Sequence, residues 1–384
     1  MRDQQLIMLP GPTNVPPRVM QAMLKPIINH RGPEFHEFYP RLLEKVKYVF
    51  QTQNDVLVLT SSGTGSVDAG VSNVIKPGDK AIVPVMGTFS ERVADLVKAY
   101  GGVPITLSVD YGKAPKASDV EELFEKNKDA KALIVVHNET STGVTVRDLA
   151  KMGEIAKKYG ALFLVDAISI LGGDELPVDK WNIDICMGAS QKCLAAPPGL
   201  ALISISQDAW KVIERQNDLA PRYFNLLRYK RYLIEDRETP YTPALSLMFA
   251  LDEAINMIME EGLDRWIWRQ KLTARAFYKA FEEDGLSLFA EENSRSNTVI
   301  AVKVPQGVSS KTLREIMRTK YSVVVAGGFG KLRDAIFRVG NMGIVSAREV
   351  VTTIAAVEGA LKELGIQNEG RGLVAALELL KELK

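Results

Sequence analysis

Short apolar runs alternate with helical patterns over the first half of the chain, and this alternation restricts the possible fold more than any other feature. Continuous apolar strands separated by helices are typical of a mostly parallel sheet covered on both faces. Such crossovers are right-handed, so we expect an α/β protein with a doubly wound or three-layer α/β/α sandwich. The predicted strands are Asp55–Leu59, Lys80–Pro84, Ala132–Val136, Leu162–Val165, Ile183–Met187 and Ala201–Ile205, with helices at 65–75, 88–100, 120–126 and 146–159 between most of them.

The pattern changes after about residue 251, where long helices precede a few separate strands. A chain of 384 residues exceeds the usual size of a single core. We therefore predict an N-terminal arm over 1–20, a large domain over 21–255 and a smaller α+β domain over 256–384. Long helices are predicted at 245–260, which crosses this limit, and at 263–283. The rest of the smaller domain has predicted helices at 311–319, 347–364 and 373–380, and strands at 298–304, 323–326 and 336–339.

Charge and cysteine content exclude several classes of protein. The 48 basic residues balance 47 acidic ones, so nucleic acid is not the expected partner. The two cysteines, Cys186 and Cys193, predict neither a disulfide framework nor a zinc site, and we expect no metal. No apolar run approaches the roughly 18 residues of a membrane span. We expect a cytoplasmic protein that does not bind a membrane.

A Gly- and Ser-rich string, Ser61–Ser66, follows the first predicted strand and opens a helix. Its free N–H groups, hydroxyls and small residues suit a phosphate at a helix N-terminus. The string equally suits an ordinary strand–helix turn with a serine cap. It lacks the third glycine of the dinucleotide fingerprint and the lysine of the nucleotide phosphate loop.

Two charged residues, Asp166 and Lys192, follow apolar strands about one βαβ crossover apart, so we expect them on neighbouring strand ends. A carboxylate at the end of an apolar strand needs a cationic partner, such as a protonated pyridine, an arginine or a helix N-terminus. Lys192 is the only charge in its Ser/Ala/Pro/Gly-rich loop. A lysine in such surroundings can have a lowered pKa and form a Schiff base.

Two further segments could contribute polar groups near these strand ends. The string His137–Gly143 follows a buried strand and is either a capped turn or a polar wall for a cofactor ring. Arg338 ends a predicted strand of the smaller domain. It is either a structural ion pair or the planar, bidentate clamp that a substrate carboxylate requires.

Together and in this order, these segments resemble the class V (fold type I) aminotransferases. The resemblance is greatest to the alanine–glyoxylate, serine–glyoxylate and serine–pyruvate aminotransferases, and it extends over almost the whole chain. The strings that carry it are PGPTNVP at 10–16, SGTG at 62–65, ETSTG at 139–143, VDAIS at 165–169 with LGG at 171–173, SQK at 190–192 with APPG at 196–199, and FRVG at 337–340.

The resemblance implies a fold type I transferase that binds pyridoxal 5′-phosphate (PLP). Lys192 would hold the cofactor as a Schiff base, Asp166 would pair with the ring nitrogen, and Arg338 would bind the substrate carboxylate. The other implied cofactor contacts are Ser62, Gly63, Thr64 and Gln191 at the phosphate, Phe89 and Ile168 on the ring faces, and Ser141 near the ring oxygen. The N-terminal arm would contribute to the site. Roles for His30, Arg31 and His137 stay open.

In this family the phosphate is also reached from a second subunit, and Tyr241 and Thr242 are the best match for that contact. The resemblance thus implies a homodimer with a shared active site. We expect a ping-pong transaminase that moves the amino group of serine or alanine to glyoxylate or pyruvate. Alternatives are a phosphoserine or aminoethylphosphonate transaminase, a cysteine desulfurase and, more distantly, a nucleotide-binding oxidoreductase. The family also includes a protein named as a soluble hydrogenase subunit.

Overall fold

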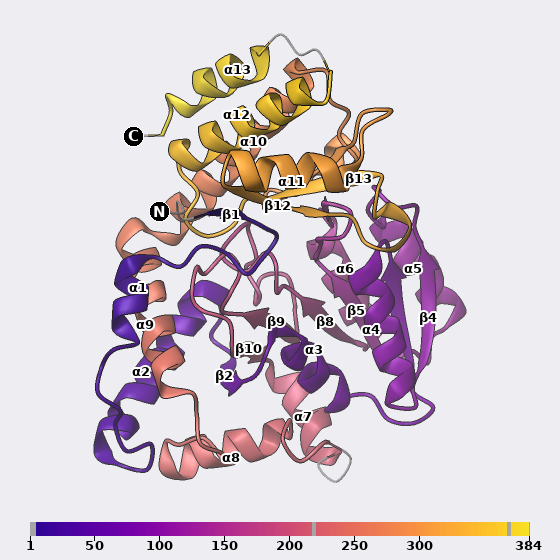
Figure 1. Cartoon of the computed structure of the whole chain (residues 1–384). Helices are drawn as coiled ribbons and strands as arrows, with labels where there is room; N and C mark the ends of the chain where they lie inside the picture. Colours follow the sequence, from indigo (N-terminus) through magenta and orange to yellow (C-terminus); the bar gives the residue numbers. More distant parts are fainter. Residues whose placement is uncertain (1–4, 217–219, 367–369, 384) are drawn as a thin grey trace.

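The computed structural model describes residues 5–216, 220–366 and 370–383, and a large sheet lies at its centre. The strands of this sheet are β2 (Asp55–Thr60), β3 (Lys80–Val85), β4 (Val103–Ser108), β5 (Ala132–Val136), β8 (Leu162–Asp166), β9 (Ile185–Ala189) and β10 (Leu200–Ile205). Their order is β2-β10-β9-β8-β5-β3-β4 (Figure 1). β10 is antiparallel to both neighbours, and every other pair is parallel. The mostly parallel sheet is therefore confirmed.

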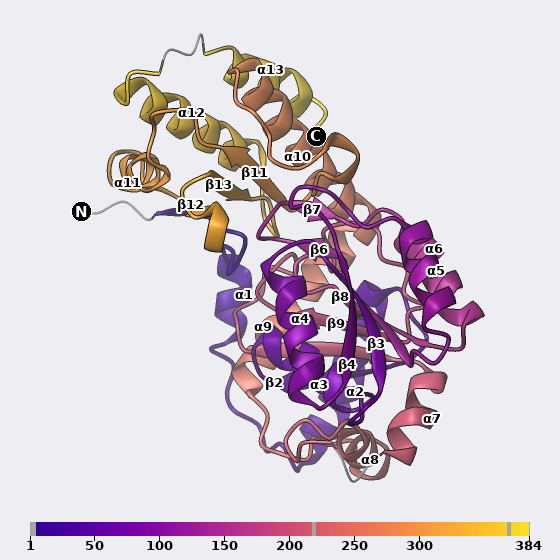
Figure 2. The ribbon, with the colours of Figure 1, turned by 90° about the vertical axis from the view of Figure 1, so that its right-hand side faces the viewer.

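Helices cover both faces of this sheet (Figure 2). Gly70 lies against Met187, whereas Phe50 lies against Gly188, the next residue of the same strand. Successive residues of a strand point to opposite faces, so the helices that carry Gly70 and Phe50 form separate layers. The predicted three-layer α/β/α arrangement is confirmed. The first layer contains α3 (Gly63–Ser72) and α4 (Thr88–Ala99), and the second contains α2 (Pro33–Phe50), α5 (Ala117–Lys126) and α6 (Leu149–Lys158).

The remaining helices of this part of the chain lie around the layers. The short helix α1 (Pro17–Ala22) and the long helix α9 (Leu245–Glu261) pack on each other, and α9 also packs on α2. α7 (Gln207–Arg215) and α8 (Leu226–Asp236) lie together at the bottom of Figure 1. The predicted domain limit at residues 255 and 256 falls inside α9, and the division into domains stays a prediction.

A second, four-stranded sheet has the order β1-β12-β13-β11 and lies at the top of Figure 1. Its strands are β1 (Leu6–Met8), β11 (Val299–Lys303), β12 (Val323–Gly327) and β13 (Ile336–Gly340). The N-terminal strand β1 runs parallel to β12, with Leu6 opposite Val323. The helices with this sheet are α10 (Leu263–Glu283), α11 (Ser310–Lys320), α12 (Ala347–Glu363) and α13 (Arg371–Leu380), with short 3₁₀ turns at Glu292–Ser294 and Gly330–Leu332.

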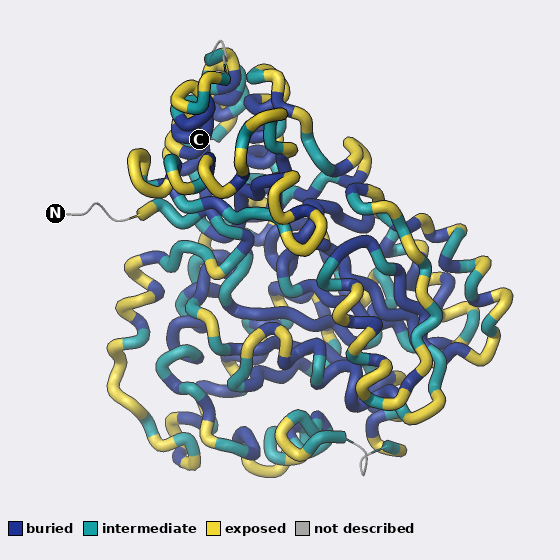
Figure 3. Tube along the Cα trace, turned by 45° about the vertical axis from the view of Figure 1, so that its right-hand side comes forward, coloured by how far each residue is buried: buried dark blue, intermediate teal, exposed yellow. Residues whose placement is uncertain are grey.

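The seven-stranded and the four-stranded sheet each have a hydrophobic core. The larger core surrounds the central strands, and the smaller one joins β11–β13 to α10, α12 and α13. The buried trace runs through the middle of both parts, while exposed residues follow the outer helices and loops (Figure 3). In the part of the chain that the structure describes, no helix combines the length and apolar character needed to span a membrane.

Candidate active site

A cavity of about 240 Å³ lies at the carboxyl ends of the central strands. It brings together eight of the predicted site residues, from four separate segments of the chain: Ser62, Gly63, Thr64, Phe89, Asp166, Ile168, Gln191 and Lys192. Asn138, Thr140, Ser169, Asp68 and Arg92 also line it. Ligands in open α/β sheets bind at this edge, so the cavity has the expected location for a cofactor.

Lys192 follows β9, and Asp166 ends the neighbouring strand β8, as predicted. The Lys192 ammonium donates a hydrogen bond to the carbonyl of Pro10, and Thr13 holds the same loop by donating its hydroxyl to the Lys192 carbonyl (3.2 Å). Gly11 packs so closely on the lysine chain that a Cβ would overlap it. Burial lowers the pKa of Lys192, which favours the neutral, nucleophilic amine.

Asp166 is a buried carboxylate that accepts one hydrogen bond, from the backbone N–H of Ile168 (3.0 Å). Burial raises its pKa to about 6, and no cationic side chain forms an ion pair with it among the described residues. A buried carboxylate is stabilised by a cation, and a protonated ring nitrogen in the cavity would provide one. The residue therefore fits the pyridine end of PLP.

The N-terminus of α3 opens on the same cavity. Ser62 is its cap residue, and its side chain accepts no capping hydrogen bond. The first N–H groups of a helix have no partner within the helix and favour an anion. Beside them, the buried Gln191 Oε1 has no hydrogen-bond partner in the described structure. These unpartnered groups fit the phosphate end of PLP.

The string after β5 forms a hairpin, β6 (Asn138–Glu139) and β7 (Val144–Thr145), with a role that the sequence did not reveal. The buried Glu139 carboxylate caps α4 by accepting from the N–H groups of Phe89 (3.1 Å) and Ser90 (2.9 Å). It also accepts the Ser141 hydroxyl (2.6 Å), which in turn accepts from the Thr88 N–H. Ser141 thus lies behind the cavity wall, while its neighbour Thr140 lines the cavity.

Arg338 lies on β13, with its guanidinium buried beside the hairpin. Its Nη1 donates to the Thr140 carbonyl (2.7 Å) and its Nε to the Gly327 carbonyl (2.8 Å). No carboxylate forms an ion pair with it among the described residues, and burial lowers its pKa. A buried cation held only by carbonyls fits an incoming carboxylate.

Tyr241 and Thr242 do not line the cavity. The Tyr241 ring stacks on Tyr223, and its hydroxyl donates to the Arg222 carbonyl (2.6 Å). Arg31 anchors the same segment by pairing with Glu238 and donating to the Thr239 carbonyl (2.7 Å).

The backbone N–H of His137 donates to the Asp166 carbonyl (3.0 Å), but His137 does not line the cavity. Its buried ring packs edge-on against Trp181, and its Nδ1 has no hydrogen-bond partner in the described structure.

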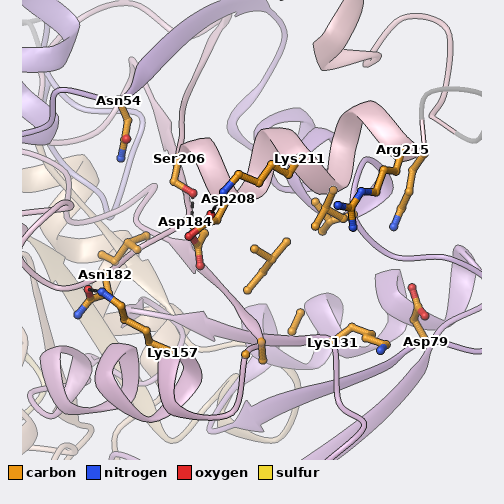
Figure 4. Close-up of a pocket in the computed structure, with 18 of the residues that line it drawn as sticks. Asn54, Asp79, Lys131, Lys157, Asn182, Asp184, Ser206, Asp208, Lys211 and Arg215 are labelled. Atoms are coloured by element: carbon orange, nitrogen blue, oxygen red, sulfur yellow. Dashed lines mark hydrogen bonds and ion pairs between the residues drawn. The ribbon is translucent and has the colours of Figure 1, made fainter.

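A larger cavity, of about 680 Å³, lies at the other end of the central strands, where the parallel strands begin. Figure 4 shows the residues that line it. Several of its charged side chains form hydrogen bonds or an ion pair with other residues of the cavity lining. Lys157 donates to Asn182 (3.2 Å), Lys211 pairs with Asp208 (2.7 Å), and Asp184 accepts from Ser206 (2.6 Å). By comparison, neither Asp166 nor Arg338 has a hydrogen bond to another described side chain, and each is held by backbone groups.

A family model described as Aminotransferase class-V matches residues 7–331 of the chain. The chain belongs to the class V aminotransferase family. It is an aminotransferase, and its cofactor is PLP, which the unpartnered groups of the cavity fit. Among the described residues, no three His, Cys, Asp or Glu side chains are grouped to hold a metal ion.

Three curated relatives extend over nearly the full length of this class V chain. An uncharacterized aminotransferase of Methanocaldococcus jannaschii is 46% identical and covers 99% of this chain and 98% of its own. A protein named soluble hydrogenase, small subunit, of a Synechococcus species is 36% identical, with 99% of each covered. The serine–glyoxylate aminotransferase of Methylorubrum extorquens is 33% identical, with 98% and 96% covered.

The crystal structure of the ureidoglycine–glyoxylate aminotransferase of Bacillus subtilis is similar to this class V chain over nearly its whole length. It superimposes with a TM-score of 0.96 at 30% identity, and the match covers 99% of each chain. The predicted fold type I architecture is therefore confirmed.

Proposed function

We propose that this enzyme transfers the amino group of a small amino acid, serine or alanine, to glyoxylate or pyruvate by a ping-pong mechanism. The observation that carries the proposal is the buried Arg338, which is held only by carbonyl oxygens near the cavity of Lys192 and Asp166. A single buried guanidinium suits a substrate that carries one carboxylate. Glyoxylate appears in the names of two relatives described above, which supports the acceptor.

Each residue has a distinct task in this proposal. PLP, when bound, supplies an electron sink for the charge that develops at the substrate α-carbon. Lys192 would bind the cofactor covalently and, once displaced, would carry the α-carbon proton of the amino donor to C4′ of the cofactor and, in the second half-reaction, a proton from C4′ to the α-carbon of the acceptor. Asp166 keeps the proton on the ring nitrogen. Arg338 orients the carboxylate of the donor and then of the acceptor.

The remaining proposed contacts hold the cofactor. Ser62, Gly63, Thr64 and Gln191 bind its phosphate, and Phe89 and Ile168 contact the two faces of its ring. Ser141 lies on the side of the ring oxygen, where its hydrogen bond to Glu139 supports the cavity wall that Thr140 lines. We also propose a homodimer in which Tyr241 and Thr242 reach the phosphate of the second subunit.

The cysteines argue against a desulfurase. That reaction needs a mobile thiol at the site, whereas Cys186 and Cys193 are both fully buried. Burial raises the pKa of both thiols, which opposes formation of the nucleophilic thiolate.

The test is the visible spectrum of the purified protein loaded with PLP. Addition of L-serine or L-alanine should convert the cofactor to its aminated form, and glyoxylate or pyruvate should restore the original band. A cofactor band that responds to L-phosphoserine but to neither small amino acid would contradict the proposed donor.

A further inference from the structure

Phe329 joins the two parts of the proposed substrate site. Its ring centroid lies 4.6 Å from the guanidinium carbon of Arg338 and 6.0 Å from the ring centroid of Phe89, in an edge-to-face arrangement. Arg338 is the proposed carboxylate anchor, and Phe89 lines the cofactor cavity. One side chain therefore borders both ends of the space that a bound amino acid would occupy.

The contacts of Arg338 restrict how a carboxylate can approach it. Its Nε and one N–H of Nη1 are already used by the carbonyls of Gly327 and Thr140. The guanidinium carbon of Arg338 lies over the ring of Phe329. A carboxylate must therefore bind in the guanidinium plane, at the remaining N–H groups of the Nη atoms, with Phe329 beside the rest of the substrate.

The backbone fixes the position of this ring. Phe329 lies in the string Gly327-Gly328-Phe329-Gly330. Gly330 has a φ of +50°, and a Cβ on Gly328 would overlap the carbonyl of Leu332. Lys331 anchors the same loop to the turn after β4, because its ammonium lies 3.6 Å from the centroid of the Tyr111 ring. Phe329 is nevertheless 38% exposed, unusual for a phenylalanine that serves only the core.

We propose that Phe329 is a specificity-determining residue, whose ring limits the substrate side chain to about the size of that of alanine or serine. The inference rests on the proposed function, because it places the substrate between Arg338 and Phe89. A phenyl ring is a rigid wall, so the carbons of a longer side chain would displace it from its contacts with Arg338 and Phe89. Truncation of the ring would leave space for those carbons.

The test compares Phe329→Ala and Phe329→Leu with wild type in the PLP-loaded enzyme. The kcat/KM values of L-alanine, L-2-aminobutyrate and L-norvaline give the preference for side-chain length. We expect Phe329→Ala to shift the norvaline-to-alanine ratio by about tenfold or more, since one methylene in a pocket changes discrimination by that order. Phe329→Leu should give an intermediate shift. Lys331→Ala, which loosens the same loop but keeps the ring, should leave the ratio unchanged.

A binding measurement separates this inference from the proposed function. Calorimetric titration with acetate and pentanoate, which carry no amino group, requires no turnover. Phe329→Ala should bind pentanoate about tenfold more tightly relative to acetate than wild type does, and Arg338→Gln should lose both. If this shift occurs while no amino acid is turned over, the donor assignment fails and the role of Phe329 stands. An unchanged ratio in Phe329→Ala, an equal shift in Lys331→Ala, or wild-type protein that binds neither acid would overturn the inference.

Discussion

The carboxylate of Glu139 holds the backbone of Phe89, accepting its N–H at 3.1 Å at the first turn of α4. Ser90 and Ser141 donate to the same carboxylate, which is fully buried. The hairpin beside Arg338 and the helix that carries Phe89 are thereby joined through one side chain.

Replacement of Glu139 by glutamine should destabilise the protein by about 2 kcal/mol or more, because an amide loses the charge and leaves some of these buried donors unsatisfied. Urea unfolding at neutral pH measures the change, with Glu154→Gln, an exposed position on α6, as the control. Equal unfolding free energies for the two variants would show that the capping contacts contribute nothing.

Replacement of Lys192 by alanine should abolish both the visible band of the bound cofactor and transamination, because it removes the amine that we propose binds PLP covalently. Lys271→Ala, a partly exposed lysine paired with Glu175, is the control and should retain both. Substantial turnover by Lys192→Ala would contradict the assignment of the lysine.

Replacement of Asp166 by asparagine should lower kcat by about a hundredfold or more, because the amide cannot stabilise a protonated ring nitrogen. The covalent bond to Lys192, and hence a visible band, should persist. Asp184→Asn is the control, since Asp184 is a partly buried carboxylate at the amino ends of the central strands, where it accepts from Ser206. Comparable losses of kcat in both variants would indicate a structural effect.

Replacement of Arg338 by glutamine should lower kcat/KM for the amino donor and the oxo acceptor alike, by roughly 10- to 100-fold, mainly through KM. This range corresponds to the loss of a charge-assisted hydrogen bond of about 1.5–3 kcal/mol. Arg314→Gln, which removes a neighbouring guanidinium beside Gly327, tests for a general effect of positive charge. A loss confined to one of the two substrates would contradict a shared carboxylate anchor.

His137 should make the protein less stable in mild acid. Burial lowers its pKa from 6.5 to about 4, so the folded state excludes a proton that the unfolded chain binds. The free energy of unfolding that depends on a neutral His137 is fully present above about pH 6.5. It falls as the pH drops toward 4, by up to roughly 3 kcal/mol. Unfolding free energies at about pH 7 and pH 5 should differ less in His137→Phe than in wild type. His36→Gln, at a partly exposed histidine, is the control, and a His137→Phe variant that keeps the full wild-type difference would refute the assignment.

The sequence predicted most of the fold because the central strands are continuously apolar and their helices amphipathic. The helix at 263–283 agrees with α10 at both ends. The edge strand β4 was not predicted, since its sequence, VPITLS, is half-exposed and contains a proline. β1 was not predicted for a different reason. It has only three residues, and they form a strand because they pair with β12, far along the chain.

The site was predictable where a residue follows a strand within a distinctive string, as Asp166 and Lys192 do. Glu139 lay inside such a string, but its task depends on α4, which contributes the donors. The importance of Phe329 depends on two rings brought together by the fold, and no spacing along the chain expresses it.

The parallel pairing of β1 with β12 also affects when the enzyme can acquire its cofactor site during synthesis. Leu6 meets Val323, so the first strand must wait until most of the chain has left the ribosome. The loop after β1 supplies Pro10 and Thr13 to Lys192, and it cannot be fixed before that pairing forms. A nascent chain therefore has its central sheet before it has a complete lysine site, and full cofactor capture is a late event of biogenesis.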